Sequence, residues 1–231
     1  MLISEIFYSI QGEGELTGMP SVFIRTAGCN LRCRWCDTPY ASWQPEGRSL
    51  SIEDILKEAS QYPSRHAVLT GGEPMIARDI HQLAAGLKVN GFHITIETAG
   101  TVAPEGICCD LASLSPKFSN STPSSAEAGS EWVRRHELTR WQPEVLRQWV
   151  TAFPFQIKLV VTDESDARES LSLLKSALPE VPNWKIQLMP EGREEATLAS
   201  RAEWLVDFCK LTGCRFCQRL HISLFGNIKG T

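Results

Sequence analysis

Short apolar segments alternate with amphipathic helices along most of this 231-residue chain. After Ser51, a suitable N-cap, one helix places Ile52, Ile55, Leu56 and Ala59 on one face. The expected strands cover residues 2–8, 21–26, 66–70, 93–97, 107–111, 155–161, 184–189 and 221–225, and the expected helices begin after 51 and cover 78–89, 132–149, 164–178 and 194–211. Strands that alternate with helices form parallel sheets, because a parallel connection needs a crossover segment.

Motifs rich in glycine, cysteine or charge follow the ends of successive expected strands. They are the cysteine-containing loop after residue 26, Gly71 to Pro74, Glu97 to Gly100, Ser115 to Lys117, and Met189 with Pro190. In a parallel β/α barrel the carboxyl ends of the strands form one face, where active sites assemble. About six strand and helix units are fewer than the eight of a closed barrel. We therefore expect an α/β fold, a partial (open) parallel β/α barrel, built as a single domain over residues 1–231.

Composition and charge exclude several classes of function. Lysine and arginine number 23 against 27 aspartate and glutamate, which gives a net charge of −4, so we expect no nucleic-acid partner. No apolar run approaches ~18 residues, and the first residues lack a basic segment followed by an apolar one, so we expect neither a membrane span nor a signal peptide. Eight cysteines in such a chain indicate a reducing compartment, so we expect a cytoplasmic protein with metal chemistry.

Three cysteines lie close together in the sequence GCNLRCRWCDT, which begins at Gly28. Cys29, Cys33 and Cys36 form a CxxxCxxC pattern, and thiolates at this spacing select zinc, copper(I) or an iron–sulfur cluster. A structural zinc site and a cubane cluster each normally take four protein ligands. Three cysteines therefore leave one iron of a cubane open to an outside ligand. The alternative interpretations are a zinc site that borrows a fourth ligand and cysteines that lie close together by chance.

The cysteine loop resembles that of the radical-SAM enzymes, in which the open iron binds S-adenosylmethionine (SAM). The resemblance rests on the spacing, on Trp35 before the last cysteine and on Gly28 before the first. Gly71 and Gly72 follow a strand, where they free backbone groups to meet a ligand. Together with the cysteine loop, they resemble the segment with which these enzymes hold the methionyl amino group of SAM.

Several motifs together resemble the 7-carboxy-7-deazaguanine synthase family over nearly the whole length. They are QGEG at residues 11–14, the cysteine loop, TGGEP, ETAG, SPK and LHISLFGNIKGT at residues 220–231. The resemblance implies a lyase that converts 6-carboxy-5,6,7,8-tetrahydropterin to 7-carboxy-7-deazaguanine with loss of ammonia, on the route to queuosine. It also implies a 4Fe-4S cluster, SAM and magnesium as cofactors, a homodimer, and an electron donor such as flavodoxin or ferredoxin.

The same resemblance assigns roles to individual positions. Cys29, Cys33 and Cys36 hold the cluster, and Thr38 gives its hydroxyl to magnesium. The SAM site takes Trp35, Cys36, Asp37, Gly72, Glu97, Ser115, Pro116 and Lys117, where Glu97 either binds SAM or braces its loop. The pterin site takes Ile10, Gln11, Gly12, Arg25, Thr70 and the Thr231 carboxylate. Arg25 suits a carboxylate because a guanidinium donates two parallel hydrogen bonds. No side chain is assigned as acid or base, because a 5′-deoxyadenosyl radical does the chemistry.

Some features stay open. Cys209, Cys214 and Cys217 form a second close set, which fits either an auxiliary metal site or incidental free thiols. His221 is a weak site candidate, and the excursion over residues 119–150 has no assigned role. The competing functions are a glycyl-radical-enzyme activase and a non-catalytic zinc-binding module. An activase acts on a protein and has no need of a carboxylate clamp such as Arg25.

Overall fold

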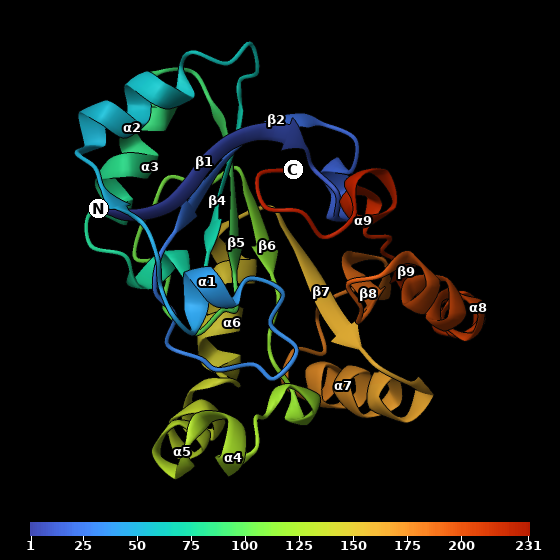
Figure 1. Ribbon diagram of the computed structural model, residues 1–231. Coiled ribbons are helices and arrows are strands. Elements are labelled where there is room, and N and C mark those ends of the chain that lie inside the picture. Colours follow the sequence, from blue (N-terminus) through green and yellow to red (C-terminus); the bar gives the residue numbers. More distant parts are fainter.

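The computed structural model describes residues 1–231, and all of its strands join one nine-stranded sheet (Figure 1). The strands lie in the order β3-β1-β2-β4-β5-β6-β7-β8-β9. They are β1 (Leu2–Ile10), β2 (Pro20–Thr26), β3 (Arg48–Ser49), β4 (His66–Gly71), β5 (His93–Thr98), β6 (Leu111–Leu114), β7 (Phe155–Val161), β8 (Ile186–Pro190) and β9 (Arg215–Phe216). From β2 to β9 neighbouring strands are parallel, whereas β1 runs antiparallel to both β2 and β3.

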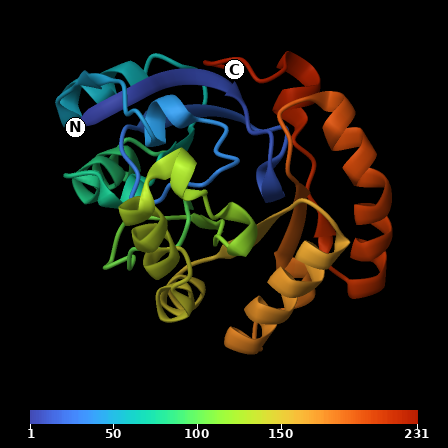
Figure 2. The same cartoon turned by 60° about the horizontal axis from the view of Figure 1, so that its bottom comes forward.

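The longer helices cover the outer face of the curved sheet (Figure 2). The helices are α1 (Pro39–Ser42), α2 (Ile52–Ala59), α3 (Ile80–Val89), α4 (Ser125–Ala128), α5 (Ser130–Thr139), α6 (Pro143–Ala152), α7 (Glu164–Ala177), α8 (Glu195–Thr212) and α9 (Leu220–Phe225). The edge strands β3 and β9 do not pair with each other, so the barrel stays open. The prediction of an α/β fold with a partial, open parallel barrel is confirmed.

The two faces of the sheet differ in chemistry, as β7 illustrates. Ile157, Leu159 and Val161 are fully buried in the main apolar core beneath the helices. The intervening Gln156 and Lys158 are also buried but point to the inside of the curl, where Gln156 bonds Ser113 and Lys158 borders a cavity. Side chains alternate between the faces of a strand. The sequence FQIKLVV therefore builds an apolar outer face and a polar inner face.

Two of the expected strands are wrong. Residues 221–225 form helix α9, which ends at Gly226 with a φ of 74° and a bond from the Gly226 N–H to the Ile222 carbonyl. A short apolar run fits strand and helix equally well by periodicity. The strand expected at 107–111 begins only at Leu111, because a turn at Gly106 and Ile107 precedes it.

Within the stretch expected to be irregular, residues 119–130, Ser124 and Glu127 form a capping box that starts the short helix α4. No helix of the fold combines the length and apolar character needed to cross a bilayer.

Candidate active site

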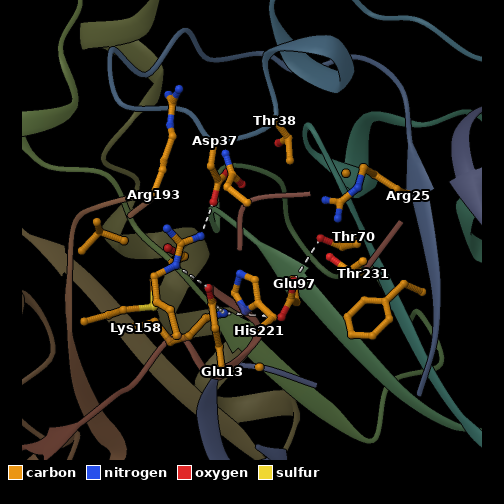
Figure 3. Close-up of a pocket in the computed structure, with 18 of the residues that line it drawn as sticks. Glu13, Arg25, Asp37, Thr38, Thr70, Glu97, Lys158, Arg193, His221 and Thr231 are labelled. Carbon is orange, nitrogen blue, oxygen red and sulfur yellow. Dashed lines mark hydrogen bonds and ion pairs between the residues drawn. The ribbon is translucent and has the colours of Figure 1, made fainter. Parts of the chain in front are cut away.

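A cavity of about 490 Å³ lies inside the curl of the sheet and is lined from both ends of the strands (Figure 3). Thr38, Gly72 and Lys117 come from loops at the carboxyl ends of parallel strands. Gln11 and Glu13 come from the loop after β1. Because β1 is antiparallel to β2, with Ile10 opposite Pro20, this second loop enters at the other end of the sheet. The cysteine loop thus closes one end of the cavity and the QGEG loop forms its floor.

A smaller pocket of about 130 Å³ adjoins the large cavity and is lined by Cys29, Cys33 and Cys36. Trp35, Thr38, Gly71, Gly72, Ala99 and Lys117 line both spaces. No three Cys, His, Asp or Glu side chains converge on one point to hold a single ion. A zinc ion needs its sulfurs about 2.3 Å from one centre, whereas a cubane binds each cysteine on a different iron. Three thiols that line one pocket without meeting at a point are compatible with a 4Fe-4S cluster.

The cysteine loop packs tightly against the GGEP loop. The Glu73 N–H donates to the Gly28 carbonyl at 3.0 Å, and a Cβ on Gly72 would lie 2.2 Å from that same oxygen. Glu73 is buried and accepts from the Thr98 hydroxyl and the Ala99 N–H, so it joins the GGEP loop to the loop after β5. Only glycine at position 72 permits this approach of the two loops.

Burial raises the pKa of the thiols of Cys29 and Cys33 to about 12. Before a metal binds, these thiols therefore stay protonated at neutral pH, although Arg32 and Lys117 lie near them. Cluster assembly must therefore release protons, as expected for metal binding by cysteine.

The excursion whose role was open packs against the cysteine loop. His136 of α5 is fully buried, its Nδ1 accepts from the Arg32 N–H at 3.1 Å, and its Nε2 lies 3.0 Å from the Ser121 hydroxyl. The Arg32 guanidinium lies 3.7 Å from the centre of the Trp132 ring. Helix α5 therefore braces the loop between Cys29 and Cys33 from outside.

Most residues predicted for SAM lie where the small pocket meets the large cavity. The Trp35 indole donates to the Asn120 carbonyl at 3.1 Å, and Lys117 Nζ lies 5.1 Å from the Trp35 ring centre and donates to Ser115 Oγ. Asp37 lines both spaces. Pro116 lines neither, so the structure does not bring this predicted residue to the cavity.

Arg25 lines the cavity, and only the Nε of its guanidinium is hydrogen-bonded within the protein. Its Nε donates to Glu5 Oε1 at 2.5 Å, and the Tyr40 hydroxyl donates to the same oxygen at 2.8 Å. Its two terminal nitrogens have no hydrogen-bond partner. Burial alone would lower the pKa of Arg25, but Tyr40 and Glu5 raise it above its ordinary value. Arg25 therefore presents a fixed cationic edge to the cavity.

Glu97 lies deeper than the SAM residues with which it was grouped. Its Oε1 accepts from Gln11 Nε2 at 3.2 Å, and its Oε2 accepts from the Thr70 hydroxyl at 3.0 Å. Figure 3 shows Glu97 beside Thr70 and Thr231. Ile10, Gly12 and Thr231 line the same cavity. The structure thus brings Glu97 together with the residues predicted for the pterin.

Sequence reasoning missed a buried charge network on the floor of the cavity. Lys158 Nζ lies 2.7 Å from Glu13 Oε2 and 3.4 Å from Glu97 Oε1, and Arg219 pairs with both Glu13 and Asp37. Lys158 could have been found from the polar positions that alternate with apolar ones in FQIKLVV. Arg219 has no such signal, because it lies in a loop between β9 and α9.

These pairings determine the charge states of the floor. Burial alone would raise the pKa of Glu13, but Lys158 and Arg219 hold it far below its ordinary range. Burial opposes the charge of Asp37 too, yet Arg219 keeps its pKa low. Burial lowers the pKa of His221, which lines the cavity next to Gly12. Glu13 and Asp37 therefore stay ionised at neutral pH beside the charged Lys158 and Arg219, while His221 stays neutral.

The second set of cysteines is divided between two apolar clusters. Cys209 and Cys214 lie in the apolar core, whereas Cys217 accepts the Gly14 N–H at 3.3 Å. No three of these side chains converge on a possible ion. The interpretation as separate buried thiols is the one that the geometry supports.

Comparisons with known proteins agree with each other. The sequence model of a protein family, described as the Radical SAM superfamily, matches residues 23–121. The chain is 45% identical to the 7-carboxy-7-deazaguanine synthase of Rhodopirellula baltica over 100% of this chain and 89% of that protein. It is 40% identical to the synthase of the same name from Halobacterium salinarum, over 99% and 92%. The crystal structure of QueE from Escherichia coli matches with a TM-score of 0.69 and 26% identity, over 95% of this chain and 94% of that one.

Proposed function

The chain belongs to the 7-carboxy-7-deazaguanine synthase family of the radical SAM superfamily, and we propose that it converts 6-carboxy-5,6,7,8-tetrahydropterin to 7-carboxy-7-deazaguanine with loss of ammonia. Relatives of that name at 40% and 45% identity span nearly the full chain. The observation that carries the proposal is one cavity with a three-cysteine pocket at one end and the free edge of Arg25 in its wall.

We assign the cofactors from the family and from the fit of the residues. Cys29, Cys33 and Cys36 would hold a 4Fe-4S cluster, and Trp35, Asp37, Gly72, Ser115 and Lys117 would surround SAM where the two spaces meet. When bound, the cluster and SAM supply the radical chemistry that activates the pterin. The protein contributes a cavity that excludes water and fixes the geometry of the reactants.

For the pterin we propose three kinds of contact. The terminal nitrogens of Arg25 pair with its carboxylate, since Glu5 and Tyr40 already fix the other edge of the guanidinium. Glu97, Thr70 and Gln11 present hydrogen-bonding groups to the heterocycle. We move Glu97 from the SAM site to this group because its hydrogen-bond partners are Gln11 and Thr70. Ile10, Gly12 and Thr231 complete the wall.

Magnesium is proposed at Thr38. The Thr38 hydroxyl has no hydrogen-bonding neighbour closer than the Cys36 sulfur at 3.8 Å, and it borders both spaces. Mg²⁺ binds few protein groups and keeps waters and substrate oxygens in its shell. One hydroxyl together with the pterin carboxylate and water is therefore a sufficient set of ligands.

The proposals for the oligomeric state and the electron donor rest on the family resemblance alone. We propose a homodimer that receives electrons from a donor such as flavodoxin or ferredoxin. We also propose that residues 1–231 act as a single domain, which the continuous nine-stranded sheet supports.

The test is an anaerobic turnover assay with cluster-loaded protein, the pterin, SAM, magnesium and a strong reductant, with products identified by mass spectrometry. We expect 7-carboxy-7-deazaguanine from the wild type and none from Cys33→Ala. Cleavage of SAM without this product would retain the radical-SAM chemistry and remove the pterin assignment. Zinc in place of iron and acid-labile sulfide would instead favour the zinc-binding module.

A further inference from the structure

Arg219 joins three loops that come from distant parts of the chain. Its Nε donates to Glu13 Oε1 at 3.1 Å, its Nη2 donates to Asp37, and its Nη1 donates to the Gly192 carbonyl. Its side chain is only 8% exposed. Glu13 belongs to the QGEG loop, Asp37 follows the last cysteine of the loop, and Gly192 lies between β8 and α8. One guanidinium therefore connects the floor of the cavity with its cysteine-loop end.

The two acids that Arg219 joins differ in what else holds them. Glu13 Oε2 also accepts from Lys158 at 2.7 Å. The Asp37 carboxylate has no hydrogen-bond donor other than Arg219, and the negative charge of Glu13 repels it. Loss of the guanidinium would therefore leave Glu13 paired with Lys158, and would leave the half-buried Asp37 carboxylate without a hydrogen-bond donor.

We propose that Arg219 is a positioning residue that fixes the Asp37 carboxylate at the edge of the SAM site and acts on SAM affinity through it. The inference rests on the proposed function for the location of SAM beside Asp37. All three nitrogens of Arg219 are engaged within the protein, in contrast to Arg25, whose terminal nitrogens are free. Arg219 therefore orients a neighbouring group, whereas Arg25 is available to a ligand.

Fixing Asp37 before SAM arrives lowers the cost of ordering it on binding. The planar guanidinium points donors in three set directions, which a lysine ammonium on a flexible stem does not reproduce. Arg219→Lys keeps the positive charge between Asp37 and Glu13 but loses part of the orientation. It should therefore recover part of the SAM affinity that Arg219→Gln loses.

The test is a double-variant cycle on SAM affinity, measured by equilibrium dialysis of labelled SAM against cluster-loaded protein without pterin. We expect Arg219→Gln and Asp37→Asn each to weaken SAM binding about tenfold to a hundredfold, as for loss of a charge-assisted hydrogen bond. The double variant should lie within about threefold of the weaker single variant, because both changes break the same interaction. Arg219→Lys should fall between Arg219→Gln and the wild type.

Two results would overturn the inference: additive losses in the double variant, or wild-type SAM affinity in Arg219→Gln. Pterin affinity is measured in parallel and should change less than about threefold in Arg219→Gln, because Glu13 keeps Lys158. Equal loss of both affinities would mean general damage to the cavity and would also count against it. Melting temperature and iron content are recorded for each variant, and Arg219→Lys supplies the cycle if Arg219→Gln does not fold. The SAM measurement needs no turnover, so failure of the pterin reaction leaves it intact.

Discussion

The outer and inner faces of β7 are built from alternate residues of one strand and follow opposite rules. On the outer face Leu159 packs in an apolar core, where burial of a leucine stabilises the fold by about 1.5–3 kcal/mol. On the inner face Lys158 is buried among carboxylates and borders the cavity. Burying a charge is costly, and its partners offset that cost only while they are all present. The outer face therefore supplies stability, and the inner face supplies charges placed for chemistry.

The largest expected effect is a difference in iron content between substitutions of two buried cysteines, one at the active-site pocket and one in the outer core. Cys33 lines the small pocket, whereas Cys209 lies in the outer core. Cys33→Ala should abolish cluster binding, because two remaining thiolates do not hold a cubane. Cys209→Ala should keep its iron and sulfide and lose only a little stability. Iron and sulfide analysis of both variants measures the contrast, and equal iron content in the two would contradict it.

Neighbouring substitutions on β7 sharpen the same contrast. Lys158→Met should lower the free energy of unfolding by about 3–5 kcal/mol, because it removes one of the two cations that hold the Glu13 carboxylate and the cation beside Glu97. Leu159→Ala should cost a similar amount, about 2–5 kcal/mol, through the cavity it leaves. The two variants should respond differently to a second substitution. Adding Glu13→Gln should restore more than half of the free energy of unfolding lost in Lys158→Met and none of that lost in Leu159→Ala. Urea unfolding is measured for the wild type and the four variants. If Lys158→Met with Glu13→Gln is no more stable than Lys158→Met alone, the ion pair is not the cause of the loss.

A smaller loss is expected when the free edge of an inner-face arginine is removed. Arg25→Lys should lower kcat/KM for the pterin about tenfold to a hundredfold, since a charge-assisted hydrogen bond contributes about 1.5–3 kcal/mol. SAM affinity should stay unchanged. Arg48→Lys is the matched control, because Arg48 pairs with Glu58 on the outside of the protein and its side chain is 56% exposed. Equal effects of the two substitutions on kcat/KM would contradict the pterin assignment.

The smallest effect concerns the brace outside the cysteine loop and appears as a dependence on pH. Burial lowers the pKa of His136 from its usual 6.5 to about 4. The unfolded chain therefore binds the proton first, and the stability that neutral His136 provides is lost as pH falls from about 6.5 toward 4. His136→Asn should flatten this part of the profile of melting temperature against pH. Identical slopes in the wild type and the variant would exclude His136 as their cause.

The contrast between the faces also explains how much could be predicted from sequence. Cys29, Cys33 and Cys36 lie within eight residues of one another, and Gly71 and Gly72 are adjacent in a second segment. Each motif can therefore be recognised from neighbouring residues in the sequence. The outer face was predictable because apolar residues repeat along each strand and helix.

Residues of the inner face come singly from separate strands and loops. The roles of Lys158 and Arg219 follow from their ion pairs with Glu13 and Asp37. These pairs join residues far apart in the sequence, so the sequence alone does not predict them. The antiparallel direction of β1, which brings the QGEG loop in as a floor, left no local mark either. Helix α9 was misassigned as a strand because five residues are too few for periodicity to distinguish the two.

Gly12 and His221 stand opposite each other where the first and last elements of the chain meet. The Leu220 N–H donates to the Gly12 carbonyl at 2.9 Å, and a Cβ on Gly12 would lie 2.1 Å from the His221 imidazole. The imidazole therefore fills the space that any side chain at position 12 would need. A larger residue at position 12 demands a smaller one at 221, with a coupling free energy of about 0.5–3 kcal/mol between the two changes. A side chain at position 12 is therefore open to the protein only after position 221 has changed to a smaller residue.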